Sequence, residues 1–222
     1  MFNVAIDGPA GAGKSTAARL AAAKLGFIYV DTGALYRTVG VAAMKRDIAT
    51  KDKEKVAAML PDIKVNIAFA ADGQHVYLDG EDVSAEIRYP EASMAASNVS
   101  AIPEVRAYLF DLQRDIAKNN DCIMDGRDIG SVILPGAPLK IFLTSSPEER
   151  ARRRFEELKQ KGTPVDYNEL LQEIIQRDYN DSHREIAPLK PCEDSVYVDS
   201  SDMTLEQVVE LICKLVSEKK VI

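Results

Sequence analysis

The chain has 222 residues, a length that predicts one domain or one domain with an insert. Its 35 acidic and 28 basic residues give a formal net charge of −7, and this acidic balance argues against a nucleic-acid partner, which requires a basic surface. A hydrophobic content of 46% excludes a disordered polymer, and no apolar run reaches the roughly 18 residues that a membrane span needs.

Short apolar segments alternate with helical patterns along most of the chain. Helical periodicity predicts helices over 14–25, which Gly26 should end, over 33–46 and over 204–219. The apolar segments predict five buried strands, at 2–7, 27–30, 122–124, 139–143 and 195–199. This alternation predicts an α/β fold, with a parallel sheet and helices on both of its faces.

Two stretches depart from this alternation. Residues 64–87 alternate apolar and polar side chains on both sides of ADGQ, which predicts a β-hairpin with room for a third strand. Residues 147–188 are almost continuously helical in pattern and rich in arginine, with a break at 162–164. Both stretches are therefore expected to be additions to the α/β core.

Residues 8–15 read GPAGAGKS and lie between the first predicted strand and the first predicted helix. They match the phosphate-binding motif G-x-x-x-x-G-K-[ST] in the position that this motif requires. Its glycines let successive backbone N–H groups point at one anion, to which the helix adds its positive end. The motif predicts Lys14 at the β- and γ-phosphates and the Ser15 hydroxyl on Mg²⁺. A glycine-rich turn without a ligand is the alternative, which the strand–loop–helix context disfavours.

Two further polar segments follow predicted strands. DTGALYR, at 31–37, would alone be an ordinary helix start, but beside a phosphate loop its Arg37 is suited to clamp a second phosphate. DGRDIG, at 125–130, follows the strand at 122–124, at the carboxyl edge where such sheets bind ligands. Asp125 there fits a metal-holding role, with Arg127 and Asp128 beside it. A turn closed by an internal ion pair is the alternative for this segment.

Arginines gather late in the chain, at positions 150, 152, 153 and 154 and again at 177 and 184. A run of charge is usually a solvated helix face. Because the chain is acidic overall and the run surrounds a break at Gly162 and Pro164, we favour a mobile lid that closes over phosphates.

Taken together, these motifs resemble the bacterial cytidylate kinase family. The sequence carries in order GPAGAGKST, DTGALYR, LDGEDVSAEIR, DGRDIGSVILPGAPLKIFL and REIAPL, so that the resemblance covers essentially the whole chain. It implies a P-loop three-layer α/β fold with a five-stranded parallel sheet, a small antiparallel β insert in the monophosphate-binding region and a helical lid. It divides a single nucleoside-monophosphate-kinase domain, 1–222, into a core (about 1–60, 100–146 and 189–222), an insert with the monophosphate-binding region (about 61–99) and a lid (about 147–188).

The resemblance also implies ATP-dependent, Mg²⁺-assisted phosphorylation of CMP and dCMP, in pyrimidine nucleotide metabolism. We expect a cytoplasmic protein, because the N-terminus shows no basic and apolar segments of an export signal. We also expect a monomer without nucleic-acid or membrane partners. Three scattered cysteines and two histidines form neither a disulfide framework nor a zinc-binding spacing.

Residue by residue, the resemblance implies the following roles. ATP would be bound by Gly8, Pro9, Ala10, Gly11, Ala12, Gly13, Lys14, Ser15 and Thr16, and Mg²⁺ by Ser15 and Asp125. The CMP phosphate would be held by Thr32 (where relatives often carry Ser), Arg37 and Arg127, the cytosine by Ser97, Arg106 and Asp128, and the ribose by Arg177 and Asp181. Transfer itself would be assisted by Lys14, Arg127, Arg154 and Arg184.

Elementary chemistry agrees with this assignment of the base. Cytosine offers an amino donor that the Asp128 carboxylate can accept, whereas uracil presents an acceptor at the same place. Three alternatives remain. A GTP-dependent switch protein would need a guanine-reading N-K-x-D segment, which the sequence lacks. A phosphotransferase for uridylate, adenylate or a non-nucleotide alcohol, and a nonenzymatic ATP-binding module, share the phosphate loop, but the module leaves the arginine run without a purpose.

Overall fold

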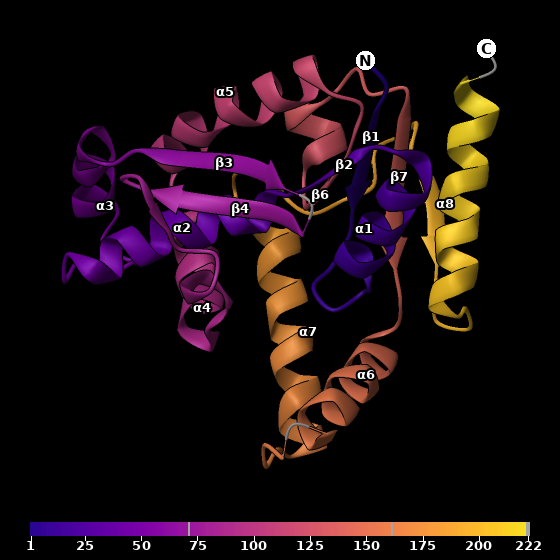
Figure 1. Cartoon of the computed structure of the whole chain (residues 1–222). Helices are drawn as coiled ribbons and strands as arrows, with labels where there is room; N and C mark the ends of the chain where they lie inside the picture. The colour runs from indigo at the N-terminus through magenta and orange to yellow at the C-terminus, as the bar shows by residue number, and fades with distance from the viewer. Residues whose placement is uncertain (71, 161, 221–222) are drawn as a thin grey trace. The chain divides into compact units, whose positions relative to one another are not determined.

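The computed structural model describes residues 1–70, 72–160 and 162–220 (Figure 1). Two compact units make up the chain: the first unit is Met1 with Ile28–Asn120, and the second unit is Phe2–Phe27 with Asp121–Ile222. The turn of the predicted hairpin includes Ala71, the predicted lid includes Lys161 and the predicted core includes 221–222, and these four residues lie outside the described residues. The division into core, insert and lid follows function and stays a prediction.

All five predicted strands are present, in a parallel sheet of order β2-β6-β1-β7-β8. Their bounds are β1 (Asn3–Asp7), β2 (Ile28–Asp31), β6 (Cys122–Gly126), β7 (Leu139–Thr144) and β8 (Val196–Asp199). In the register of β1 and β6, Ile6 lies beside Asp125 and Asp7 beside Gly126. Both strands therefore end at the same edge of the sheet, and the loops that follow them start side by side.

The helices of the second unit lie in two pairs (Figure 1). Helix α1 (Lys14–Leu25) lies beside α8 (Leu205–Lys220), and α6 (Pro147–Gln160) lies beside α7 (Tyr167–His183). Gly26 ends α1 in the left-handed conformation, with φ 69°, as the sequence predicts. A single π-helical turn, Ile129–Ile133, follows β6.

The first unit contains the predicted hairpin. Strands β3 (Val65–Ala70) and β4 (Gly73–Leu78) pair antiparallel, and the short β5 (Glu81–Asp82) adds the third strand. Four helices accompany this sheet: α2 (Thr32–Lys45), α3 (Lys53–Met59), α4 (Pro90–Val99) and α5 (Pro103–Asn119). The sequence patterns predict α2, but not α3, α4 or α5.

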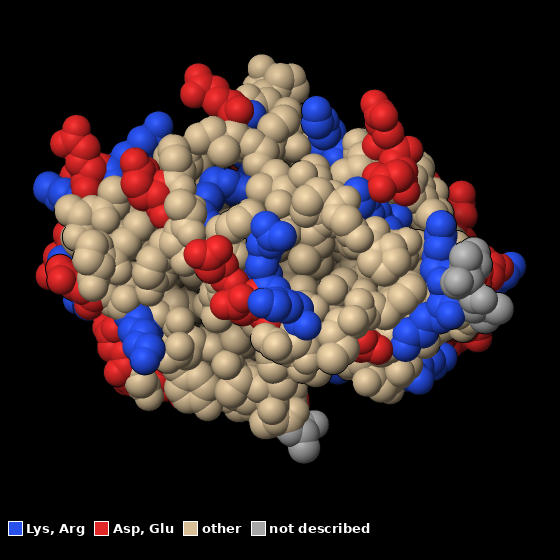
Figure 2. Space-filling view, turned by 90° about the horizontal axis from the view of Figure 1, so that it is seen from above, with Lys and Arg blue, Asp and Glu red and all other residues tan. Residues whose placement is uncertain are grey.

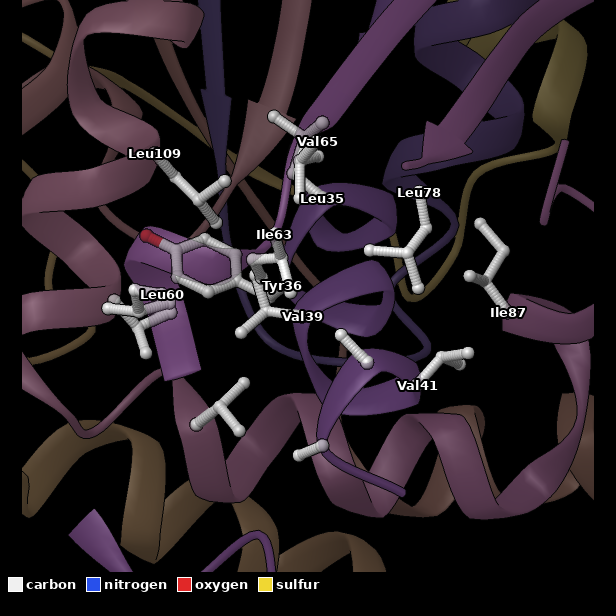
Figure 3. Close-up of a cluster of buried hydrophobic side chains, with 14 of the residues drawn as sticks. Leu35, Tyr36, Val39, Val41, Leu60, Ile63, Val65, Leu78, Ile87 and Leu109 are labelled. Atoms are coloured by element: carbon white, nitrogen blue, oxygen red, sulfur yellow. The ribbon is translucent and has the colours of Figure 1, made fainter. Parts of the chain in front are cut away.

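One apolar cluster holds the first unit together (Figure 3). Its side chains point toward one another from α2, from β3 and β4 and from α5. Its larger members include Leu35, Tyr36, Val39, Val41, Leu60, Ile63, Val65, Leu78, Ile87 and Leu109. Burying a side chain of this size stabilises a fold by about 1.5–3 kcal/mol, so the hairpin is packed into the unit and is not an appendage.

Charged side chains of both signs are interspersed on the face shown in Figure 2. Several of the ion pairs join exposed residues that are close in sequence, such as Lys55 with Asp52 at 3.1 Å. Exposed pairs of this kind contribute little to stability, with a median of about 0–1 kcal/mol. Within the described ranges, no helix has both the length and the apolar character to cross a lipid bilayer.

Candidate active site

The phosphate-binding loop joins β1 to α1 in the second unit. Gly8 has φ 149° and Gly13 has φ 81°, backbone conformations that residues with a Cβ rarely adopt. A Cβ at Gly8 would lie 1.9 Å from the Leu143 carbonyl oxygen, so that no other residue fits between β1 and β7. The predicted strand, loop and helix are therefore present with the backbone that an anion-binding loop needs.

Lys14 is the buried cation of this loop. Its side chain is only 4% exposed, and its Nζ donates to the Pro9 carbonyl at 2.6 Å. Burial first, and then the positive charge of Arg127, lower the pKa of Lys14 below its ordinary value. A bound polyphosphate would have the opposite effect on this pKa, because an adjacent anion favours the charged form.

Ser15 and Asp125 place two oxygen atoms next to each other beside the loop. The Ser15 hydroxyl donates to the Asp125 Oδ2 at 2.9 Å, and Asp125 is 4% exposed at the end of β6. Mg²⁺ in nucleotide sites takes one or two protein oxygens together with phosphate oxygens and water. The structure brings these two residues into direct contact, and their oxygen atoms are of the kind that this ion takes.

Asp7, which the sequence motifs did not single out, organises the neighbouring loop. Its two carboxylate oxygens accept hydrogen bonds from the backbone N–H groups of Ile129 and Gly130, both at 2.8 Å. Asp128, at the start of this turn, does not cap it with its own side chain. A Cβ at Gly130 would lie 3.1 Å from Lys140 Cδ and 3.3 Å from Asp7 Oδ2, so glycine leaves room for this close approach. Asp7 thus ties the end of β1 to the segment that carries Arg127 and Asp128.

We predict that Asp7 makes stability depend on pH. Burial is the main cause that raises the pKa of Asp7 from 3.8 to about 6. A carboxyl group whose pKa is raised binds its proton more tightly in the folded state, so its ionisation destabilises the fold as the pH rises from about 4 to 6. The expected loss is about 3 kcal/mol, because a tenfold change in proton affinity corresponds to about 1.4 kcal/mol.

Asp7→Asn, which cannot ionise, is the reference for this measurement. The unfolding free energies of both proteins, from urea titrations between about pH 4 and 7.5, should diverge by this amount, the wild type losing stability with rising pH. Parallel pH profiles of the two proteins would show that the Asp7 carboxyl titrates normally.

Charged residues of α7 and of the segment after it face the loop after β6. Arg127 Nε donates to Asp181 Oδ2 at 3.1 Å, and an Arg184 nitrogen lies 3.8 Å from Asp128 Oδ1. Asp128 is 6% exposed. Arg127 therefore has an ion-pair partner on α7. Arg177, the other predicted ribose residue, is half-buried on α7.

The structure separates the clustered arginines of α6. Arg150 is 2% exposed, donates to the Ala10 carbonyl of the phosphate loop at 3.0 Å and pairs with Asp178 of α7. Arg153 lies on the same face, 3.9 Å from where a Cβ of Gly13 would stand. Arg154, the predicted catalytic member, pairs instead with Glu157 of its own helix at 2.9 Å. Spacings of three and four residues both place side chains on one helix face, so the sequence alone does not separate Arg153 from Arg154 beside Arg150.

Two of the predicted phosphate-binding residues, Thr32 and Arg37, lie on α2 in the first unit. Thr32 is the first residue of the helix and is 3% exposed. Asp31 caps the helix, since its Oδ1 accepts from the Ala34 N–H at 3.1 Å, and its Oδ2 lies 3.7 Å from Arg37. One corner, where β2 becomes α2, thus positions both residues.

Two predicted base-reading residues, Ser97 and Arg106, lie on helices that pack against α2. Ser97 is half-buried on α4, and Arg106 is 9% exposed on α5. Helices α2 and α4 approach closely at Gly40, where a Cβ would be 2.7 Å from the Ala95 Cβ. The first unit therefore carries Thr32, Arg37, Ser97 and Arg106, and the second unit carries the other predicted site residues.

Comparison with known proteins places this chain among relatives of similar length. The sequence model described as Cytidylate kinase matches residues 4–218. A cytidylate kinase of Caldicellulosiruptor saccharolyticus is 53% identical over 96% of this chain and 95% of its own length. A cytidylate kinase of Exiguobacterium sp. is 46% identical over 99% and 98%.

Among solved structures, an uncharacterized protein from Eubacterium ventriosum has a TM-score of 0.54 to this chain, covering 98% of it and 99% of that protein. At 12% sequence identity, this likeness concerns the fold alone. The sequence relatives go further, because about half of the residues are identical in alignments that span nearly the whole of both chains. The chain belongs to the cytidylate kinase family.

Proposed function

We propose that the chain transfers the γ-phosphoryl group of ATP, bound with Mg²⁺, to CMP and dCMP. The observation that carries this proposal is the match to the cytidylate kinase family over residues 4–218. The phosphate-binding loop supports the donor half of the reaction, since it holds a buried Lys14 and a Ser15–Asp125 pair suited to Mg²⁺.

Phosphoryl transfer needs positioning and charge neutralisation more than covalent help, so no general base is required. Mg²⁺, when bound to Ser15 and Asp125, would neutralise phosphate charge and orient the donor. Lys14 would contact the β- and γ-phosphates, and its low exposure would strengthen that interaction because water screens it little.

The acceptor would be held by residues of distinct chemistry. Its phosphate would be bound by Thr32, Arg37 and Arg127, its cytosine by Ser97, Arg106 and Asp128, and its ribose by Arg177 and Asp181. A carboxylate accepts from the cytosine amino group and opposes the uracil O4, which favours cytidylates over uridylate.

Helices α6 and α7 would form the lid that excludes water, because hydrolysis of ATP is the competing reaction. Arg154 and Arg184 are the predicted lid arginines at the transferred group. Arg153 is added to them, because it lies near Gly13 of the phosphate loop. Arg153 and Arg154 each pair with a glutamate of α6, Glu149 and Glu157, so proximity to the loop and not the ion pair distinguishes Arg153.

A coupled assay of ADP release tests the proposal. ATP with Mg²⁺ should support turnover with CMP and dCMP, and less with UMP, AMP, GMP and shikimate. Omitting Mg²⁺ in the presence of a chelator should abolish the reaction. Turnover confined to AMP or shikimate would contradict the assignment of a cytidylate acceptor.

A further inference from the structure

Gln74, in the β-hairpin, contacts the corner that carries Thr32 and Arg37. Its side-chain amide makes two hydrogen bonds to the backbone of Asp31, one in each direction. The Asp31 N–H donates to Gln74 Oε1 at 2.8 Å, and Gln74 Nε2 donates to the Asp31 carbonyl at 3.1 Å. Because the Asp31 N–H can only donate and the Asp31 carbonyl can only accept, these contacts determine the orientation of the Gln74 amide group.

A primary amide is the side chain suited to this place. Strand β2 is at the edge of the parallel sheet, and an edge strand leaves backbone N–H and C=O groups without a strand partner. Both groups of one residue point to the same side of a strand, so a partner must supply one donor and one acceptor together. Gln74 supplies both, and its amide stands in for a paired strand residue at Asp31.

Asp31 is the residue through which this contact reaches the helix start. Its backbone is held by Gln74, while its carboxylate caps α2 at Ala34 and faces Arg37 at 3.7 Å. A shift of Asp31 would therefore move the first turn of α2 together with the Arg37 partner. The third strand of the same sheet, β5, contacts the other end of α2, where Lys45 pairs with Glu81 at 3.2 Å. This second contact is 14 residues away from Asp31 and offers a matched control.

We propose that Gln74 is a positioning residue for the acceptor phosphate: by bracing the Asp31 backbone, it holds Thr32 and Arg37 in place. This inference rests on the proposed role of Thr32 and Arg37 at the CMP phosphate. It gives the hairpin insert a part in the reaction, since the insert carries the brace on β4 and is packed against α2.

The test compares Gln74→Met, which keeps the length of the side chain but removes both hydrogen bonds, with Lys45→Met at the other end of α2. Gln74→Met should raise the KM for CMP by about tenfold, and leave kcat and the KM for ATP within about twofold, because a position is lost and not a chemical group. Lys45→Met should leave all three constants within about twofold, since its ion pairs are exposed. Arg37→Ala serves as the reference for the proposed phosphate site and should raise the KM for CMP. Circular dichroism checks that each variant folds. Gln74→Glu, which keeps only the hydrogen-bond acceptor, should raise the KM for CMP at least about threefold. This variant replaces Gln74→Met in the comparison if Gln74→Met does not fold.

The outcomes separate this inference from the function on which it rests. If Arg37→Ala raises the KM for CMP and Gln74→Met does not, the brace is overturned and the phosphate site stands. If neither does, the phosphate site itself is wrong and the brace falls with it. Equal increases of the KM for CMP in Gln74→Met and Lys45→Met would contradict the proposal, as would a rise in the KM for ATP that matches the rise for CMP. Either result would show that Gln74 stabilises the hairpin in general and does not position the phosphate-binding residues.

Discussion

Replacing Lys14 by Met should lower kcat by roughly a thousandfold, which corresponds to about 4 kcal/mol of transition-state stabilisation. Methionine retains a stem of similar length but removes the cation expected at the β- and γ-phosphates. The side chain is 4% exposed, and burial disfavours its charge, as the lowered pKa of Lys14 indicates. The unfolding free energy should therefore not fall, because an apolar side chain is easier to bury than an ammonium group.

Lys24→Met is the matched control, since it makes the same change in the last turn of the same helix, at an exposed position. Steady-state rates with CMP, together with thermal unfolding of all three proteins, make the comparison. Activity of Lys14→Met within about threefold of wild type would place Lys14 away from the reacting phosphate.

The phosphate-binding loop and the parallel sheet could be predicted because their signals are local. A buried strand, a glycine-rich turn and a helix follow one another in sequence, and Gly26 ends α1 at the residue where the pattern stops. The contact between Ser15 and Asp125 is long-range, yet it follows from two local facts. Ser15 lies at the start of the helix that follows β1 and its loop, Asp125 lies near the end of β6, and parallel strands end at a shared edge.

Helices α4 and α5 of the first unit were missed for different reasons. Helix α4 buries small residues, Ala92 and Ala95, against a close-packed partner, so its hydrophobic periodicity is weak. Helix α5 carries clear signals, with Pro103 at its first position and Val105 and Leu109 at helical spacing. Helix α4 could therefore hardly be predicted from the hydrophobic pattern alone, whereas helix α5 could.

Side-chain partners were the least predictable part of the site. Nothing near Asp7 in the sequence indicates that it accepts hydrogen bonds from residues more than a hundred positions later. Gln74 likewise meets Asp31 only because the hairpin packs against α2. Among the arginines of α6, composition indicated a phosphate-facing cluster, but only the direction of each side chain separates Arg150 from Arg154.

Asp128 tests the recognition of the base. Its carboxylate should accept a hydrogen bond from the cytosine amino group, and hydrogen bonds to charged groups contribute about 1.5–3 kcal/mol. Asp128→Ala should therefore lower kcat/KM for CMP by about tenfold to 150-fold. In Asp128→Asn the amide can donate to the O4 of uracil, so that efficiency with UMP is retained or raised while efficiency with CMP falls. The ratio of kcat/KM for UMP to that for CMP should rise at least about tenfold.

A second role for Asp128 would give a different pattern of rates. Asp128 is buried and lies 3.8 Å from Arg184, so it could act by holding that arginine at the transferred phosphate. Both substrates share the phosphate, and in that case Asp128→Asn and Asp128→Ala would impair CMP and UMP equally. Arg184→Gln provides the comparison, because loss of this arginine should lower kcat for both substrates without changing their ratio. If the ratio of kcat/KM for UMP to that for CMP stays at the wild-type value in Asp128→Asn, the role of Asp128 is to hold Arg184. If this ratio rises, the role of Asp128 is to recognise the base.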